Sequence, residues 1–362
     1  MNKPWLVNIG STLALKSIKW GLPFAETAIK NTIFEQFCGG TNLLSTVPAI
    51  EILHKYGIYA ILDYGAEGKE TEKDFNQTMV ETLRAIEFAE SQKGKVPVVS
   101  TKLTGMVRFD LLMKLNEGKP LEKSETTEYE TFLKRIDSIC HLAHEKKIGI
   151  FIDAEESWIQ NPIDHVANLM MERYNKERVI VYNTFQLYRH DRLAYLKHSF
   201  EESKSKNYMM GAKLVRGAYM EKERNRALEL GYPSPIQVDK LSTDKDFDNA
   251  IRFCVDHYET LGSCNATHNI SSNKLQAELI KSRNIQINHP HLNFCQLYGM
   301  SDNITYNLGA AGYNVAKYVV YGSVHDVIPY LIRRAQENTS VTGDMSREYQ
   351  MIEKEMKRRN LV

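Results

Sequence analysis

The sequence lacks long apolar runs, has few cysteines and carries almost no net charge. No hydrophobic stretch approaches the about 18 residues that a membrane-spanning helix needs. The N-terminus shows no apolar core followed by a cleavage site, so export is not expected. The five cysteines lie far apart without a CxxC pair, which predicts reduced, buried thiols in a cytoplasmic protein. A formal net charge of +1 gives no reason to expect nucleic acid as a partner.

Several familiar catalytic motifs are missing as well. No GxGxxG follows the first predicted strand, which argues against a dinucleotide-binding, doubly wound sheet. There is also no GxSxG, no P-loop and no cysteine–histidine nucleophile pattern. The acids of Asp153-Ala-Glu-Glu156 have no matching ligands at metal-binding spacing, and the histidine pairs in HLAH and HPH fit surface or packing roles. We therefore expect no metal site.

The chain is long enough for one large domain with appendages. We divide it into an N-terminal helical segment (1–56), a central domain (57–340) and a C-terminal helical tail (341–362). The first segment carries two helical patterns, ETAIKNTIFEQFC and TVPAIEILHKYG, but too few apolar residues for a core of its own. The methionines of the tail fit either an ordinary packed stripe or a lid or docking element beside the site.

From residue 58 onward, short apolar runs rich in β-branched residues alternate with long amphipathic segments. The runs are 58–68, 96–106, 148–157, 178–188, 208–219, 263–269, 292–300 and 314–322. Near-continuous apolar strands that are each followed by a helix are typical of a parallel sheet buried on both faces. Eight such units over about 280 residues predict an α/β protein with a (β/α)8, TIM-like barrel.

Polar side chains stand at the end of every predicted strand. They are Asp63, Lys102, Asp153, Gln186, Lys213 with Arg216, Thr267 with His268, Gln296, and Tyr318. Active sites of such barrels lie at the carboxyl ends of the strands, so these groups predict a functional mouth rather than chance helix caps. Lys102 needs a partner if it is buried, and we expect Asp153 to fill that role. The alternative is a structural ion pair inside the barrel.

Two further features predict an anion-binding site. Tyr330, Arg333, Arg334 and Glu337 follow the last strand at i, i+3, i+4 and i+7, which places them on one face of a helix. Paired guanidinium groups suit bidentate capture of a carboxylate or phosphate, although a solvated face with an Arg–Glu pair is the alternative. Gly217 lets the backbone approach a phosphate or a flavin edge closely, unless it serves an ordinary turn.

These motifs resemble those of the proline dehydrogenase family. The similarity rests on KLVRGAY with MEKER, then GYPSPIQVDKLSTDKDFDNA, ATHN, QLYGM, and YVVYG with PYLIRRAQEN, in the family order. It covers roughly residues 34–338, and LDYGAEG with FCGG is similar to the monofunctional bacterial and mitochondrial branch. The resemblance implies a distorted (β/α)8 barrel that binds FAD, without the aldehyde dehydrogenase domain of the bifunctional members.

The resemblance also implies an activity and its partners. It implies that L-proline is oxidised to 1-pyrroline-5-carboxylate by hydride transfer to FAD, and that a membrane quinone reoxidises the flavin. The protein is then expected in the cytoplasm with peripheral contact to the inner face of the membrane. Pyrroline-5-carboxylate dehydrogenase is the implied functional partner.

Residue roles follow from the matching positions. Lys102, Arg333 and Arg334 are implied to surround the proline carboxylate, while Asp153 orients these cations. The catalytic set is Lys102, Asp153 and Lys213. The residues implied to wall the proline ring are Ala218, Tyr219, Leu297, Tyr318 and Tyr330. Those implied to hold FAD are Gln186, Lys213, Val215, Arg216, Gly217, Ala218, Thr267, His268 and Glu337.

Two positions depart from the family pattern, and three other functions stay open. Lys213 stands where the family often has Arg, and Val320 replaces the Pro of the Tyr-x-Pro-Tyr-Gly run. The bulk of Tyr318 leaves little room for a 4-hydroxyl group, which favours proline over hydroxyproline. The alternatives are a hydroxyproline-preferring dehydrogenase, a Schiff-base lyase or aldolase that uses Lys102, and a non-catalytic amino-acid-binding module.

Overall fold

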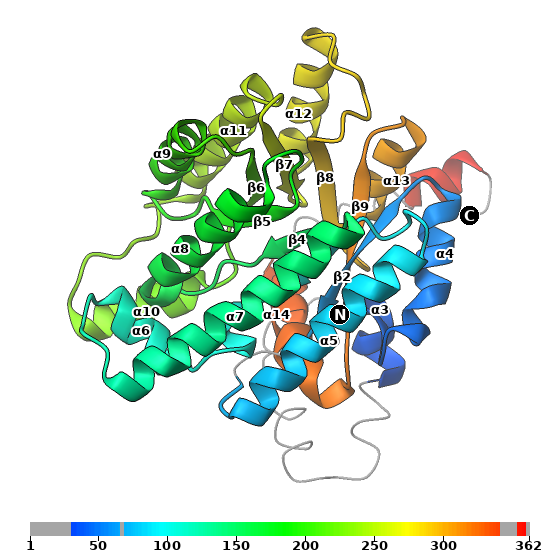
Figure 1. The fold of residues 1–362 in the computed structure, drawn as a ribbon. Helices are drawn as coiled ribbons and strands as arrows, with labels where there is room; N and C mark the ends of the chain where they lie inside the picture. Colours follow the sequence, from blue (N-terminus) through cyan, green and yellow to red (C-terminus); the bar gives the residue numbers. More distant parts are fainter. Residues whose placement is uncertain (1–29, 66–68, 341–352, 360–362) are drawn as a thin grey trace.

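Eight parallel strands form a closed ring at the centre of the protein (Figure 1). A computed structural model describes residues 30–65, 69–340 and 353–359, apart from the side chains of residues 31–32 and 335–340. The ring strands are β2 (Tyr59–Tyr64), β3 (Val98–Thr101), β4 (Gly149–Ile152), β5 (Val181–Gln186), β6 (Met210–Val215), β7 (Leu261–Ala266), β8 (Leu292–Leu297) and β9 (Val315–Tyr321). Seven of the eight predicted runs contain one of these strands, and the run 263–269 overlaps β7, which begins two residues earlier, so the barrel prediction is confirmed.

The last strand closes the ring. β9 pairs in parallel with β2 on one side and with β8 on the other, so that Tyr318 is level with both Ile61 and Leu297. Its alternate residues face opposite ways: Val315, Val319 and Tyr321 pack among the outer helices, whereas Ala316, Tyr318 and Val320 belong to the inner cluster. Both faces are buried, which explains the near-continuous apolar run. The strand continues to Tyr321, so Tyr318 lies within it, not at its end as the sequence predicted.

Helices surround the ring as the alternating pattern predicted. They are α5 (Glu72–Ser91), η3 (Leu103–Gly105), α6 (Phe109–Asn116), α7 (Lys123–Lys146), α8 (Ser157–Tyr174), α9 (Arg192–Ser205), α10 (Met220–Leu230), α11 (Lys240–Asp256), α12 (Ile270–Ser282) and α13 (Asp302–Ala310). Side-chain caps fix where some begin: Thr71 accepts from the Asp74 N–H before α5, and Asn269 accepts from the Ser272 N–H before α12.

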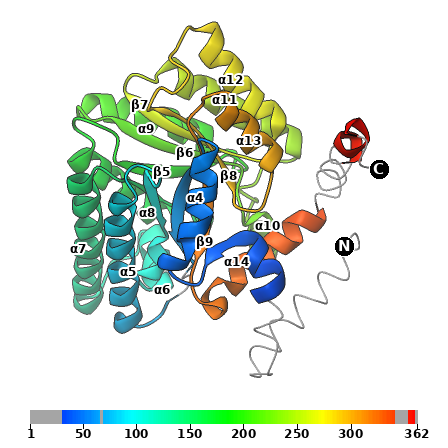
Figure 2. The same cartoon turned by 90° about the vertical axis from the view of Figure 1, so that its right-hand side faces the viewer.

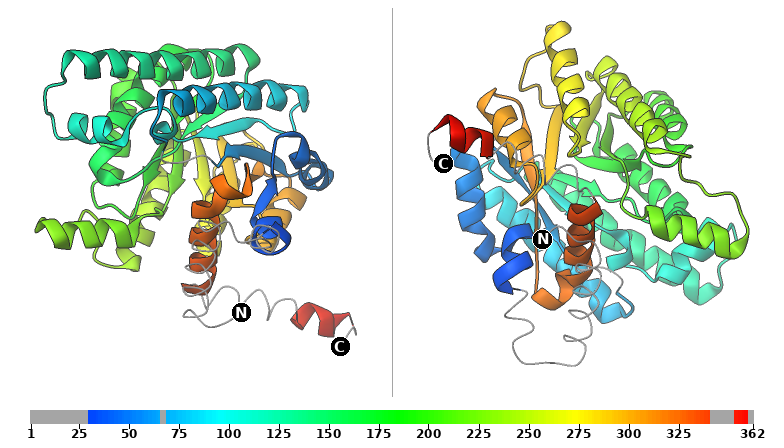
Figure 3. Two further views of the ribbon diagram at one scale, coloured as in Figure 1. Left: turned by 90° about the horizontal axis from the view of Figure 1, so that it is seen from below. Right: turned by 180° about the vertical axis from the view of Figure 1, so that it is seen from behind.

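The helix that follows β9, α14 (Val324–Ser340), does not stand on the outer wall. It lies beneath the carboxyl ends of the strands (Figures 1 and 3), where Tyr330, Arg333 and Arg334 line the same cavity as the strand-end residues. The chain reaches this position through Gly322, whose φ of +149° is rarely available to other residues. A Cβ there would also come within 3.2 Å of Val327 Cγ1.

The N-terminal segment contributes a strand as well as helices. Its elements are η1 (Lys30–Phe34), α3 (Glu35–Phe37), β1 (Cys38–Gly40), η2 (Leu44–Thr46) and α4 (Val47–Lys55). The predicted helix through Cys38 is wrong at that end, because Cys38 and Gly40 pair with β9 at Val320 and Tyr321, past the point where β8 ends. α4 packs outside the ring beside β2 and ends before Gly57, as predicted (Figure 2).

Two regions complete the description. In the tail, residues 341–352 lie outside the described residues, whereas 353–358 form a short helix. Among the helices that the structure describes, none combines the length and the apolar character needed to cross a bilayer. The boundaries at residues 56 and 340 remain predictions.

Candidate active site

A cavity of about 510 Å3 opens at the carboxyl ends of the strands, beneath α14. Sixteen of the seventeen side chains predicted for the site line it together. They are Lys102, Asp153, Gln186, Lys213, Val215, Arg216, Gly217, Ala218, Tyr219, Thr267, His268, Leu297, Tyr318, Tyr330, Arg333 and Arg334. The remaining one, Glu337, has a side chain outside the described residues. The structure therefore brings the predicted groups together, while their roles stay predictions.

Asp153 is the centre of the hydrogen-bond network in this cavity. Its carboxylate accepts from Lys213 Nζ at 2.6 Å, from the Tyr318 hydroxyl at 2.8 Å and from Ser100 Oγ at 3.0 Å. Burial on its own would raise the pKa of Asp153, but the charges of Lys213 and Lys102 and these hydrogen bonds outweigh it and lower the pKa below the ordinary value. Asp153 is therefore an ionised anchor for the cations around it.

Lys102 lies between two carboxylates. Its Nζ is 3.4 Å from Asp63 Oδ2 and 3.7 Å from Asp153 Oδ2. The expected partner Asp153 is thus confirmed, and Asp63, the last residue but one of β2, is the nearer one. Both carboxylates are buried, so the two ion pairs fix the position of the Lys102 side chain. A lysine held in this way can bind an anion in the cavity.

Inside the barrel, the ammonium group of Lys213 lies over the aromatic ring of Tyr318. Lys213 Nζ is 4.6 Å from the centre of the Tyr318 ring and 5.2 Å from that of Phe151, within cation–π range. Burial, together with the nearby charges of Asp153 and Asp63, raises the pKa of Tyr318 well above its ordinary value. The Tyr318 hydroxyl is therefore a permanent donor to Asp153, and its ring forms a fixed wall.

Arg216 and Gly217 form a rigid corner where β6 ends. The Arg216 guanidinium donates to Asp244 Oδ1 at 2.8 Å, to Thr267 Oγ1 at 2.6 Å and to Ser272 Oγ at 3.1 Å. Gly217 has a φ of +138°, and a Cβ on it would lie 2.4 Å from the Tyr188 ring. Only glycine fits here, which leaves its backbone open toward the cavity.

His268 is a neutral group at this site. Burial, with the charges of Lys317, Arg334 and Arg216, lowers the pKa of His268 from 6.5 to about 3. Its Nδ1 lies 2.9 Å from Ser301 Oγ. An uncharged imidazole can donate or accept a hydrogen bond at physiological pH without adding to the positive charge of the cavity.

Cationic side chains outnumber acidic ones around the cavity. Six of the lining residues are Lys or Arg, whereas the described lining has two carboxylates, Asp63 and Asp153. On α14, the Arg334 guanidinium lies 5.2 Å from the centre of the Tyr330 ring. Such a surface favours ligands that carry negative charge, such as a carboxylate or a pyrophosphate.

Sequence reasoning missed several lining residues. They are Ala154, Thr184, Lys240, Ala266, Asn269, Ile270, Ser271 and Cys295. Asn269 had a readable signal, because an Asn directly after a strand-end His at the start of a helical pattern is a typical N-cap. Lys240 had none, since the 231–239 loop that brings it to the mouth follows no periodic pattern.

The acids at 153–156 serve three separate partners. Asp153 binds Lys213, Glu155 accepts from the N–H and hydroxyl of Thr104, and Glu156 pairs with Lys222. No cluster of three or more His, Cys, Asp or Glu side chains that could hold a metal ion occurs in the described part of the chain. This stretch therefore links the mouth of the barrel to Lys213, to η3 and to α10.

Glu155 gives a testable dependence of stability on pH. Burial raises the pKa of Glu155 to about 7, although hydrogen bonds from Thr104 oppose the rise. A carboxyl whose folded pKa lies above its unfolded value stabilises the protein fully below about pH 4 and loses that contribution as pH rises through about 7. Relative to Glu155→Gln, the wild type should lose about 3 kcal/mol of unfolding free energy between about pH 4 and pH 8. Denaturant titrations of both proteins across this range measure the difference. A constant difference would contradict the assignment.

An eight-stranded α/β barrel with a cavity lined by lysine and arginine at its strand ends defines the class of this protein. Within that class, the family model for "Proline dehydrogenase" matches residues 46–347. The chain belongs to the proline dehydrogenase family.

Relatives agree with this assignment, and a solved structure shares the fold. "Proline dehydrogenase 1, mitochondrial" from Dictyostelium discoideum is 32% identical over 91% of this chain, which spans 65% of that relative's length. "Hydroxyproline dehydrogenase" from Xenopus laevis is 28% identical over 92% of the chain and 79% of its own length. Proline utilization A (PutA) from Bdellovibrio bacteriovorus, solved after inactivation by N-propargylglycine, superposes with a TM-score of 0.77 at 19% identity. That match covers 88% of this chain and 34% of PutA, and it shows the common fold.

Proposed function

We propose that this protein oxidises L-proline to 1-pyrroline-5-carboxylate with bound FAD as the oxidant. The proposal rests on one observation: two sets of residues line the same cavity. They are the Arg333–Arg334 pair of α14 and the residues of the Asp153 network in the barrel. A small zwitterion needs cations for its carboxylate, and these must hold its reacting carbon in one position. Membership of the family supports proline as that zwitterion.

Different residues of the cavity bind different parts of the substrate. Arg333, Arg334 and Lys102 take the substrate carboxylate, and Asp153 keeps Lys102 and Lys213 in place through its ion pairs. The Tyr318 ring, fixed by its hydrogen bond to Asp153, forms one wall for the proline ring. The Tyr330 ring closes the cavity from α14 and excludes water.

The residues on the β6–β7 side of the cavity fit FAD. The open backbone at Gly217 and the fixed Arg216 guanidinium suit the phosphates, and the neutral His268 beside Thr267 suits a polar edge of the flavin ring. The Ala218 N–H donates to Gln186 Oε1 at 3.4 Å, which holds the Gln186 side chain beside the Arg216–Gly217 corner. When bound, FAD supplies the oxidant that accepts a hydride from the proline carbon next to nitrogen.

Reoxidation is assigned to a membrane quinone, and the product passes to pyrroline-5-carboxylate dehydrogenase. A quinone acceptor requires peripheral contact with a membrane, which we place on the inner face facing the cytoplasm. Five free, buried cysteines support a reducing compartment. The name of the Dictyostelium relative places that protein in mitochondria.

Absorption spectroscopy of the purified protein tests the proposal. We expect a yellow protein with flavin bands that bleach when L-proline is added without oxygen. N-Propargylglycine should inactivate it, as it inactivates the PutA neighbour. A colourless protein that is trapped by borohydride with a carbonyl substrate would indicate a Schiff-base enzyme instead. A protein that binds proline but reduces no dye would indicate a binding module.

Tyr318 sets a prediction for substrate choice, because the relatives include a hydroxyproline dehydrogenase. Tyr318→Ser opens space against the proline ring and should raise kcat/KM for 4-hydroxyproline relative to proline by about tenfold or more. Tyr318→Phe is the matched control: it removes the hydrogen bond to Asp153 but keeps the ring, so the preference for proline should persist. Steady-state kinetics with both substrates measure the ratio. An unchanged ratio in Tyr318→Ser would refute the steric role.

A further inference from the structure

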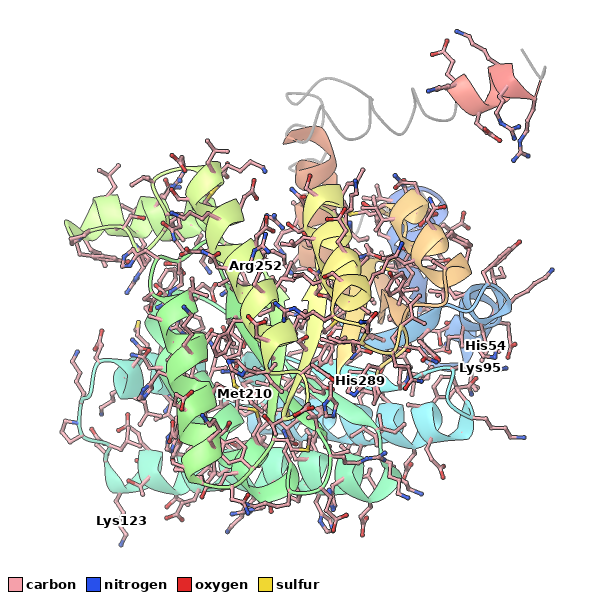
Figure 4. The ribbon with its side chains drawn as sticks, turned by 90° about the horizontal axis from the view of Figure 1, so that it is seen from above. His54, Lys95, Lys123, Met210, Arg252 and His289 are labelled. Atoms are coloured by element: carbon pink, nitrogen blue, oxygen red, sulfur yellow. The ribbon has the colours of Figure 1, made fainter. Side chains whose placement is uncertain are left out.

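A second cavity, of about 310 Å3, lies at the opposite end of the barrel, where the strands begin. Figure 4 looks onto this end, with Met210, the first residue of β6, and His289, just before β8, near its middle. We call it the lower cavity. Its walls include Ile61, Val98 and Phe151, so its interior is mainly apolar. Its volume falls in the range of about 300–1,000 Å3 that small-molecule sites occupy.

Side chains fill only part of the lower layer of the barrel. Gly149, Gly211 and Gly262 lie near the starts of β4, β6 and β7. Neighbouring side chains occupy the space beside them: a Cβ on Gly211 would lie 2.9 Å from the Tyr182 ring, and one on Gly262 would lie 3.1 Å from Val179 Cγ2. The volume that these side chains leave open is the lower cavity.

The charges around the lower cavity have one sign. Lys147 and Arg178 stand exposed at its rim with His291 beside them, and none of the described lining residues is an Asp or Glu. Within the described part of the chain, the side chains of Lys147 and Arg178 make no hydrogen bond or ion pair. Two unpaired cations over an apolar pocket favour an anionic group at the rim.

Tyr182 adds a hydrogen-bonding group to the wall of the cavity. Its side chain is 7% exposed and lines the cavity beside Arg178 and Val179. Burial raises the pKa of Tyr182, while the charge of Arg178 acts in the opposite direction, so the phenol stays protonated within electrostatic reach of that guanidinium. A protonated phenol can donate to a carboxylate on a ligand that also pairs with Arg178.

We propose that the lower cavity is a second binding site, specific for a small molecule with an apolar body and one carboxylate. The apolar body fills the pocket beneath Phe151, and the carboxylate accepts from the Tyr182 hydroxyl and pairs with Arg178 and Lys147. The ligand contacts the underside of Phe151, whose ring is 5.1 Å from that of Tyr182 and 5.2 Å from Lys213 Nζ. Only this layer separates it from the upper cavity.

Calorimetric titration of the full-length protein with octanoate and with octan-1-ol tests the site. We expect one octanoate per chain, bound at least about tenfold more tightly than the alcohol because of the two rim cations. From hexanoate to octanoate, affinity should rise about fourfold per methylene. Arg178→Gln combined with Lys147→Gln should reduce octanoate to the affinity of the alcohol. Both residues are exposed, so the variant should keep the melting temperature of the wild type.

Three further variants locate the bound molecule. Val179→Trp should fill the cavity and abolish binding of both probes, whereas Arg252→Gln, at an exposed arginine of α11, should change nothing. Arg334→Gln, in the upper cavity, should also leave octanoate affinity unchanged. Loss of binding in Arg334→Gln, equal affinity for acid and alcohol in the wild type, or several weak sites per chain would each overturn the proposal.

Discussion

Replacing both Arg333 and Arg334 with methionine is expected to raise the proline concentration for half-maximal flavin reduction by about 100-fold or more. Each hydrogen bond to a charged partner contributes about 1.5–3 kcal/mol, so loss of two corresponds to a factor of about 10² to 10⁴. Methionine keeps the length and apolar stem of each side chain, so α14 should stay in place. Anaerobic titration of the flavin bands with L-proline measures the change directly.

The matched control for this experiment is Arg252→Met. Arg252 is an exposed arginine on α11, away from the cavity (Figure 4), and its replacement should leave the titration unchanged. The flavin content of all variants should equal that of the wild type, because the residues assigned to FAD are untouched. If the double variant retained wild-type affinity for proline, Arg333 and Arg334 would not be the residues that bind the substrate carboxylate.

Replacing Asp153 with asparagine should lower the free energy of unfolding by about 3–5 kcal/mol. The change leaves the buried ammonium of Lys213 without its 2.6 Å partner and removes one of the two carboxylates beside Lys102. Turnover with proline should fall as well, because both lysines lose their fixed positions. Urea denaturation measures the stability, and stopped-flow flavin reduction measures the rate.

The pH dependence of this difference has a definite sign. The folded pKa of Asp153 lies below its unfolded value, so its contribution is present above about pH 4 and is lost as pH falls through the folded pKa. The stabilities of wild type and Asp153→Asn should therefore begin to approach each other as the pH falls below about 4, and should meet only below the folded pKa of Asp153. Ser100→Ala, which removes one neutral donor to the same carboxylate, should cost only about 1 kcal/mol. A larger loss in Ser100→Ala than in Asp153→Asn would contradict the charge argument.

Local patterns in the sequence were sufficient for the ring and for most of the cavity lining. Each strand is buried on both faces, so it leaves a continuous apolar run that is easy to recognise. The polar residues that follow these runs converge because parallel strands present their carboxyl ends on one side. The spacing of Tyr330, Arg333 and Arg334 likewise placed them on one face of α14.

Features that depend on long-range packing were out of reach. Nothing in the sequence shows that β1 pairs with the end of β9, or that α14 lies across the mouth rather than on the outer wall. The pairing of Lys102 with Asp63 depends on the relative positions of neighbouring strands, and the lower cavity depends on which side chains the fold turns into the ring where the strands begin. They depend on the register between strands and on how the barrel closes, and the periodicity of apolar residues along the sequence contains no information about either.

The order of elements along the chain ties ring closure to the proposed arginine clamp. β9 supplies the pairing that joins β8 to β2, and α14 follows it immediately with the two arginines. A polypeptide interrupted before residue 315 leaves two strand edges unsatisfied and lacks both arginines. During synthesis, the protein therefore gains a complete sheet and the residues of the proposed clamp in the same late step, so we expect unfinished chains to carry no partial activity.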